Sequence, residues 1–204
     1  MDLKEFNLAN REIYIQGDIS EESSAQLLRD IRNLKGTDKA IVDYNNTVLR
    51  YIYDAERNGI ELPEFPLPQA HVFLTSGGGF VYNGLAMFDS LVDLSNYCPT
   101  DITASGICGS AAFLIFLGIP YENRKCTMNT EFLVHQVSCG YVGTTAAIEE
   151  GAADLKRLNQ KMFDIISKNT KITKEKLKKV YDGKKDWYFD AKTAKELGVV
   201  SEIV

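Results

Sequence analysis

A serine at the start of an apolar run is the first candidate for chemistry in this chain. Ser110 follows a glycine in the stretch ASGICGSAAFLIFLGIP, residues 104–120. If it begins a helix, its hydroxyl lies beside backbone N–H groups that lack internal partners, where the helix dipole favours negative charge. That environment suits a nucleophile, because acyl transfer forms an oxyanion that backbone donors stabilise. Serine is also a common helix cap, and for Ser110 taken alone the cap is the preferred interpretation.

Two further motifs could assist such a serine. The stretch SGGG, residues 76–79, follows an apolar segment, and its glycines let backbone N–H groups face an anion or an extended peptide. It lacks the lysine of a phosphate-binding loop and the spacing of a dinucleotide fingerprint, so a plain turn is the alternative. His135 ends the apolar stretch FLVHQ, where it could be a general base or a buried structural residue.

Other reactive side chains carry less weight. His71 opens a predicted strand that is far from Ser110 in sequence, and Cys108 lies two residues before the predicted helix start, outside the oxyanion geometry. The chain has only two histidines and no C-x-x-C pair, so we expect no metal site, no cofactor and reduced thiols. Its four cysteines are Cys98, Cys108, Cys126 and Cys139.

Strands and helices that could position these residues alternate along the sequence. Hydrophobic patterns predict strands at 11–19, 70–76, 101–108 and 131–136. They predict helices at 20–36, with a capping serine and a terminal glycine, and at 41–59, 82–97, 110–118 and 144–168. Residues 60–69 form a proline-rich connection without regular structure. This alternation predicts an α/β fold with mostly parallel strand pairing.

The last of these predicted helices is unusually long. Apolar residues recur at steps of three or four from Thr144 to about Lys168. A helix of that length spans roughly 35 Å, more than a compact domain of this size usually needs. We therefore expect it to pack on another subunit.

Composition limits the class of protein. The 204 residues are 45% apolar, which suits one domain over residues 1–204 with a substantial core. The net charge of −5 comes without a basic run, so we expect neither a nucleic-acid nor a membrane partner. The amino terminus is charged and lacks the apolar stretch of a secretory signal, so we expect a cytoplasmic protein.

Four stretches taken together resemble the proteolytic subunit of the Clp protease, the ClpP family of serine peptidases. They are LTSGGGFVYNGLAMFDSL, GICGSAAFLIFLG, FLVHQVSCGYVGTTAAIEEGAADLKRLNQKM and DGKKDWYFDAKTAKELGVVSEIV. The family has a Ser-Pro-Gly-Gly loop, an Ala-Ala-Ser-Met-Gly elbow, a His-Gln-Pro strand end and an Ala-x-x-Gly-Leu-[VI]-Asp segment at these places. The resemblance covers residues 11–34 and 70–204, and the interval of 25 residues between Ser110 and His135 agrees with the family.

This resemblance implies a fold, an assembly and a catalytic set. The fold is ClpP/crotonase-like, with repeated ββα units and a handle helix at 144–168 by which two heptameric rings interlock. Ser110 matches the nucleophile, His135 matches the base, and Asp186 matches the residue that orients the imidazole. Asp182 is the alternative third residue.

The resemblance also implies contacts with the substrate. Gly79 and Ala111 match the two backbone donors of the oxyanion hole. The segments 79–81 and 138–140 match strands that hold the substrate as an added β-strand. The residues expected to bind substrate are Gly78, Val81, Ser138 and Gly140.

The sequence departs from the family at several places. Ala112 stands where the family has glycine, Val137 where a proline follows His-Gln, and Gly77 where the first loop has proline. About ten residues precede the first predicted strand, fewer than in the family, where this segment helps to engage an ATP-driven unfoldase. The connection at 35–69 is longer than in the family, which suggests an insertion. These departures leave the unfoldase partner open.

The preferred hypothesis is a serine endopeptidase that hydrolyses unfolded proteins or peptides inside an oligomeric chamber. A specialised relative, such as a phage-type maturation protease or a gateless peptidase, is an alternative, as is a non-catalytic ring subunit. An alternative of another class is the related crotonase fold. Its paired backbone N–H groups stabilise enolates of acyl-CoA thioesters and need no Ser-His-Asp set.

Overall fold

The computed structural model describes residues 10–47 and 65–204 as strands, helices and connections. The strands are β1 (Glu12–Gln16), β2 (Ala70–Ser76), β3 (Thr100–Gly109), β4 (Arg124–Cys126), β5 (Glu131–Val134), β6 (Trp187–Asp190) and β7 (Glu202–Ile203). The helices are α2 (Glu21–Thr37), α4 (Val81–Tyr97), α5 (Ala111–Phe116), the 3₁₀ turn η1 (Tyr121–Asn123), α6 (Thr145–Asn169), α7 (Lys174–Asp182) and α8 (Ala191–Glu196). Residues 39–47 are also helical.

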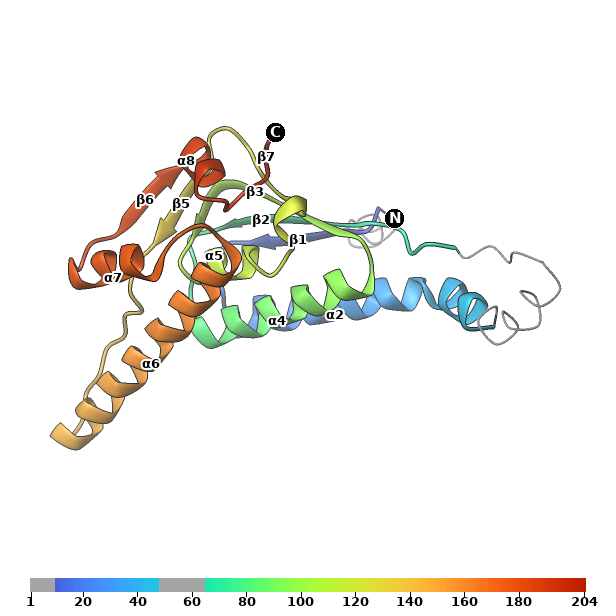
Figure 1. Cartoon of the computed structure of the whole chain (residues 1–204). Coiled ribbons are helices and arrows are strands. Elements are labelled where there is room, and N and C mark those ends of the chain that lie inside the picture. Colours follow the sequence, from blue (N-terminus) through green and yellow to red (C-terminus); the bar gives the residue numbers. More distant parts are fainter. Residues whose placement is uncertain (1–9, 48–64) are drawn as a thin grey trace, which may run out of the picture.

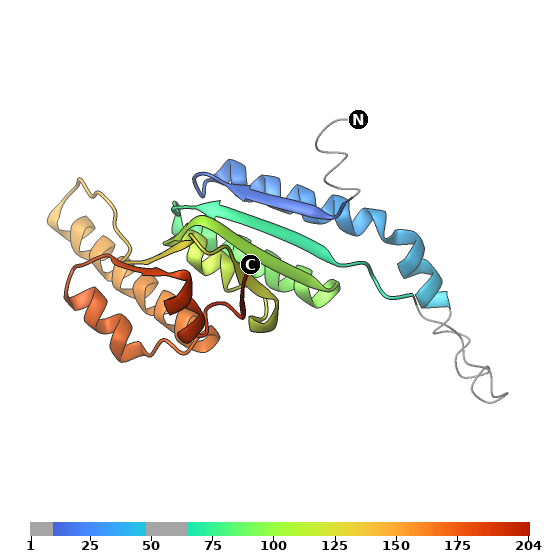
Figure 2. The same ribbon diagram turned by 90° about the horizontal axis from the view of Figure 1, so that it is seen from above.

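One sheet organises the molecule (Figure 1). Its main path runs β1-β2-β3-β4-β7, and β5 joins it by pairing with β3 on one side and β6 on the other. All pairs are parallel except β5–β6. The helices α2 and α4 cover one face of this sheet, as Figures 1 and 2 both show. The predicted α/β class with mostly parallel pairing is therefore confirmed.

The central strand β3 changes partner along its length. Its first half pairs with β4 and its second half with β5. Between the two halves the register with β2 shifts, because Leu74 lies opposite Ala104 whereas Ser76 lies opposite Cys108. Gly106 adopts φ +65° within this irregularity, a conformation that glycine allows without strain. The bulge lets β3 leave β4 and carry its carboxyl end to β5.

The short helix α5 lies in the core directly after β3. All six of its residues are buried. Phe113 and Phe116 pack edge-on against Phe132 of β5, with ring centroids 6.1 and 5.8 Å apart. Burial of this kind holds the start of α5, and with it the end of β3, in a fixed position.

The long predicted helix is present as α6, which is 25 residues long and begins at the capping residue Thr144. Its carboxyl-terminal half contributes Leu158, Met162 and Ile166 to the core. Its amino-terminal end projects away from the sheet (Figure 1). The ribbon in Figure 2 shows the same projection from above.

The first predicted helix ends differently from the expectation. Gly36 does not terminate it, because α2 continues to Thr37 and Asp38 caps it. Asp38 is buried, and its carboxylate accepts hydrogen bonds of 2.6 and 3.2 Å from Arg11. The Arg11 Nε also donates to the Gln69 carbonyl at 3.1 Å. This buried pair fixes the helix end and joins it to the starts of β1 and β2, a tertiary constraint that outweighs the local signal of a glycine.

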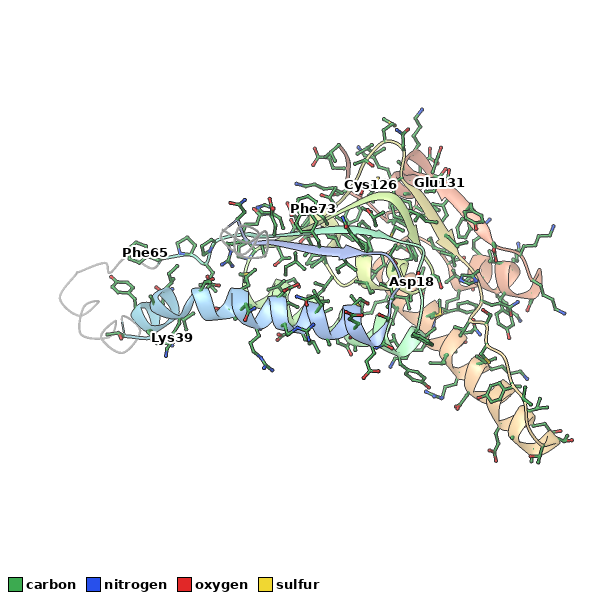
Figure 3. All side chains as sticks on the ribbon, turned by 180° about the vertical axis from the view of Figure 1, so that it is seen from behind. Asp18, Lys39, Phe65, Phe73, Cys126 and Glu131 are labelled. Carbon is green, nitrogen blue, oxygen red and sulfur yellow. The ribbon has the colours of Figure 1, made fainter. Side chains whose placement is uncertain are left out.

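The described parts of the connection at 35–69 lie at the end of the sheet remote from α6. Of the predicted helix at 41–59, residues 41–47 are helical and the rest lies outside the described residues. Residues 65–69 are irregular, as predicted for the proline-rich stretch. Asn45 and Phe65 exchange hydrogen bonds of 2.8 and 3.2 Å between amide side chain and backbone. Figure 3 shows Lys39 and Phe65 at one end of the molecule and Asp18 far from them.

Within residues 10–47 and 65–204, every helix falls short of the length and apolar character needed to cross a bilayer.

Candidate active site

Ser110 occupies a strained turn between β3 and α5. Its backbone has φ 53° and ψ −122°, which is rare for a residue with a side chain. Ser110 occupies the N-cap position of α5, but its hydroxyl makes no capping hydrogen bond, so the side chain does not act as an ordinary helix cap. Its N–H donates to the Leu133 carbonyl at 2.9 Å, which ties the turn to β5. A serine on a strained turn from strand to helix is the geometry of a nucleophile elbow.

The strand β5 brings a histidine and an aspartate to the same edge of the sheet. Gly109 of β3 lies opposite Leu133 of β5, so Ser110 and the carboxyl end of β5 are neighbours. Val134 of β5 lies opposite Trp187 of β6, the last pair of that antiparallel ladder. His135 and Asp186 are the next residues beyond this pair. The three residues therefore meet where β3 and β5 end and β6 begins.

The side chains of His135 and Asp186 are close but not hydrogen-bonded to each other. The His135 Nδ1 lies 3.9 Å from the Asp186 Oδ1, and these side chains are 26% and 57% exposed. No hydrogen bond joins the Ser110 hydroxyl to His135 in the part of the chain that the structure describes. A hydrogen bond between the imidazole and the carboxylate requires a movement of roughly 1 Å. Catalytic hydrogen bonds are often long without substrate and tighten when it binds.

The competing residues are set apart from this site by their position or by burial. His71 pairs with Asp101 at 2.9 Å at the amino ends of β2 and β3, opposite to the edge that carries Ser110. Asp182 lines a groove of about 330 Å³ between α6 and α7. Cys108 is fully buried, and burial raises the pKa of its thiol well above the usual value, which suppresses the reactive thiolate.

The glycine loop lies directly against Ser110. A Cβ atom added to Gly78 would lie 2.6 Å from the Ser110 Cβ and 3.1 Å from the Ala111 nitrogen. The loop is held by Ile19, whose N–H donates to the Gly78 carbonyl at 2.9 Å and whose carbonyl accepts from Phe80 at 2.8 Å. Ile19 carries no signal for this role in the sequence, because only its pairing with the glycine loop reveals it.

Two backbone donors remain available beside the serine. Neither the Gly79 N–H nor the Ala111 N–H has an acceptor within residues 10–47 and 65–204. The Gly78 N–H, in contrast, donates to the buried Ser76 hydroxyl at 3.1 Å. The loop thus uses Ser76 to fix its own shape and leaves the next amide unpaired. Two unpaired N–H groups near a serine are the donors that an oxyanion hole requires.

The two segments expected to be strands beside the substrate are not strands. Gly79 forms only an isolated bridge with Ile19, and Val81 begins α4. Residues 135–140 lack regular structure, and Ser138 and Gly140 are exposed. The expectation of preformed strands is therefore wrong, because the helix start takes up one segment and no neighbouring strand reaches the other. Their role in substrate binding stays a prediction.

Clustered metal ligands are not part of this site. Across the described residues, no group of three or more histidine, cysteine or acidic side chains could hold a metal ion.

Comparisons with known proteins agree on one family. A family model described as Clp protease matches residues 66–204. ATP-dependent Clp protease proteolytic subunit 3 of Rhizobium etli is 33% identical over 135 residues, which cover 65% of this chain and 66% of that protein. This chain thus spans about two thirds of the length of that relative. ATP-dependent Clp protease proteolytic subunit 1 of Rhodopirellula baltica is 27% identical over 204 residues, covering 100% of this chain and 76% of the relative.

A solved structure supports the same fold. A ClpP1 mutant from Listeria monocytogenes superimposes with a TM-score of 0.73 at 22% identity, covering 100% of this chain and 96% of the other. The family match favours the peptidase hypothesis over the acyl-CoA enzyme. Since the matched residues 66–204 make up most of the sequence and include Ser110, His135 and Asp186, the chain belongs to the Clp protease family of serine endopeptidases.

Proposed function

We propose that this chain is a serine endopeptidase that hydrolyses unfolded proteins or peptides with Ser110, His135 and Asp186. The observation that carries the proposal is the strained turn at Ser110, beside which β5 and β6 deliver a histidine and an aspartate. Strain at a non-glycine residue persists only where the surrounding structure enforces it, and such residues concentrate at functional sites.

The proposed reaction has two steps. His135 accepts the Ser110 proton while the serine oxygen attacks the scissile carbonyl, and Asp186 stabilises the resulting imidazolium. The Gly79 and Ala111 N–H groups hold the oxyanion. His135 then returns the proton to the amine as the C–N bond breaks, which leaves an acyl-enzyme. A water molecule, deprotonated by His135, attacks this ester, and the acid product leaves as Ser110 regains its proton.

Substrate recognition would rely on the peptide backbone. The segment 138–140 is exposed and has no strand partner within the described residues, so its backbone groups are accessible to an extended peptide. The Gly78–Gly79 turn lies against Ser110. Hydrogen bonds to main-chain groups bind many sequences with little discrimination. Val81, Ser138 and Gly140 are the residues to which we assign these main-chain hydrogen bonds. Gly78, whose N–H and carbonyl already pair with Ser76 and Ile19, is assigned a packing contact with the peptide.

We assign an oligomeric chamber to the same protein. The projecting end of α6 carries exposed apolar residues, among them Val142 just before it and Ile148 within it. Two stacked heptameric rings would bury this end. Because the relatives above are described as ATP-dependent, we assign the delivery of folded substrates to a separate ATP-driven unfoldase. Unfolded peptides would enter without it.

A serine-directed fluorophosphonate tests the catalytic set. The wild-type chain is expected to be labelled at Ser110, as located by peptide mass spectrometry, and Ser110→Ala is expected to remain unlabelled. His135→Ala and Asp186→Asn should each lower peptide hydrolysis by about 10³- to 10⁴-fold, the usual scale for triad residues. Asp182→Asn is the matched control and should retain activity. Labelling that persists in Ser110→Ala, or a larger loss in Asp182→Asn than in Asp186→Asn, contradicts the assignment.

A further inference from the structure

A buried asparagine interrupts the apolar face of α6. Asn159 is 4% exposed and lies between Leu155, Leu158 and Met162 on the side of the helix that faces the domain. Burial of a side-chain amide is unfavourable unless its polar atoms find hydrogen-bond partners. An apolar residue could also pack at this position. The presence of a buried amide there therefore has to be explained by the hydrogen bonds that it makes.

Both ends of this amide are paired. The Asn159 Nδ2 donates to the Leu155 carbonyl one turn earlier in α6 at 2.7 Å. The Asn159 Oδ1 accepts from the Val137 N–H at 2.9 Å. The partners fix the orientation, because a carbonyl can only accept and a backbone N–H can only donate. The bond to Leu155 therefore holds the Oδ1 towards Val137.

The segment that receives this hydrogen bond has little else to hold it. Among the described residues, the Val137–Asn159 bond is the only hydrogen bond that residues 135–143 form with the rest of the protein. Two further anchors are apolar. The Val137 side chain packs against the core, and the Tyr141 ring lies on Gly151 of α6 so closely that a Cβ atom there would overlap it. The segment thus runs back along α6, fixed near each end.

We propose that Asn159 is a positioning residue for His135. The polar anchor lies two residues beyond His135, a span of about 7 Å along the chain, so it restricts where the imidazole can lie. The inference rests on the proposed function, in which His135 is the base. The family that this sequence resembles has proline, which carries no N–H, at the position of Val137. A valine there adds an N–H group that needs a buried acceptor, and Asn159 provides it.

The chemistry of the pair predicts a dependence between two positions. Asn159→Leu keeps the size and removes the acceptor, which leaves the Val137 N–H unpaired. Val137→Pro removes the N–H, so in that variant the Asn159 Oδ1 no longer accepts a hydrogen bond from residue 137. The loss of activity caused by Asn159→Leu should therefore be large in the wild type and small in the Val137→Pro variant.

The experiment is this double-mutant cycle on the full chain, read by fluorophosphonate labelling and by peptide hydrolysis. We expect Asn159→Leu to lower kcat by about 10- to 100-fold with KM changed less than about threefold, because a displacement near 1 Å can reduce the rate by that much. In the Val137→Pro background the same change should lower kcat by less than about threefold. Gln160→Leu, next to it on the exposed side of α6, is the matched control and should retain the wild-type rate.

A direct readout does not depend on catalysis. Hydrogen–deuterium exchange of the peptide containing Val137 should become faster in Asn159→Leu and stay unchanged in Gln160→Leu. If wild-type Ser110 is never labelled, the proposed function fails, whereas the exchange data still report on the hydrogen bond. If the wild type is labelled and Asn159→Leu reacts equally fast, or is slowed equally in both backgrounds, Asn159 does not position His135 through Val137 and the inference is overturned.

Discussion

Ser110 keeps an unfavourable backbone conformation because its neighbours leave it no alternative. Positive φ at a residue of this kind raises the free energy by about 1–3 kcal/mol. The bond from its N–H to Leu133 and the fully buried helix that follows resist relaxation. The result is a hydroxyl that extends from a rigid turn and is not engaged in capping. Rigid support of this kind lowers the reorganisation that a nucleophile needs before attack.

The close contact between the glycine loop and Ser110 predicts that an added methyl group would impair catalysis. Gly78→Ala would place a methyl group 2.6 Å from the Ser110 Cβ and strain a backbone with φ +112°, so the loop or the turn must move. We expect peptide hydrolysis to fall by about 100-fold or more, because the oxyanion donor and the serine would no longer be aligned. Enzyme assays with the purified variant measure this.

The neighbouring glycine is the control for that change. A Cβ atom at Gly77 would meet nothing within 4 Å. Gly77→Ala should therefore retain activity within about threefold and unfold at the wild-type temperature. If Gly77→Ala and Gly78→Ala lose equal activity, the loss is not caused by the contact between residue 78 and Ser110, and the prediction is contradicted.

The reactive residues differ in how visible they are in the sequence. The pattern Gly-Ser before an apolar run indicates a helix start, and the resemblance adds the role of Ser110. Its φ and the missing cap bond depend on β5, which is more than twenty residues away. The roles of Asn159 and Ile19 likewise depend on contacts with residues that are distant in sequence, so neither residue was predicted. An asparagine within the apolar spacing of α6 is a signal that could have identified Asn159.

Among the elements, β5 does most to build the site. It pairs with β3 on one side and with β6 on the other, and it contributes Phe132 to the cluster around α5. The strand has only four residues. Local periodicity predicted its existence, whereas its partners are set by packing between distant segments. The short elements β4, η1, β6, α7, α8 and β7 have no counterpart among the elements predicted from periodicity, because so few residues repeat within each of them.

The buried ion pair at the opposite end of the sheet predicts a loss of stability. Asp38→Asn leaves the Arg11 guanidinium buried without a negative partner, since the two side chains are 3% and 11% exposed. Breaking a buried pair from one side typically lowers the free energy of unfolding by about 3–5 kcal/mol. Thermal or urea unfolding measures the difference.

An exposed pair in the same layer serves as the comparison. Lys35 and Asp93 lie 2.6 Å apart, but their side chains are 30% and 69% exposed. Asp93→Asn should lower the free energy of unfolding by less than about 1 kcal/mol, because water screens such pairs. If Asp38→Asn is equally mild, the pair does not stabilise the end of α2 and the starts of β1 and β2.

At the scale of the whole molecule, the projection of α6 leaves apolar side chains in water. Val142 is fully exposed and Ile148 is 45% exposed at the projecting end. Apolar groups gathered on a projecting element commonly mark an interface between chains. This surface is consistent with the proposed stacking of rings.

Charge placed at this end tests the assembly. We expect the wild type to form a particle with a mass far above the 22.8 kDa of one chain. Val142→Asp and Ile148→Asp together should reduce that mass, because burial of a carboxylate in an apolar contact is unfavourable. Light scattering measures the mass, and a monomeric wild type would contradict the proposed chamber. Val204→Asp, an exposed valine far from this end, should leave the mass unchanged.

The uneven anchoring of the site has a consequence for its response to heat. Ser110 precedes a helix whose residues are all buried, whereas the segment 135–143 is held by one hydrogen bond, the packing of the half-buried Val137 side chain and one aromatic contact. Segments with few buried contacts open locally with much less free energy than global unfolding requires. Warming should therefore detach the histidine from the serine while the sheet is still intact. The enzyme should lose activity reversibly several degrees below its calorimetric transition.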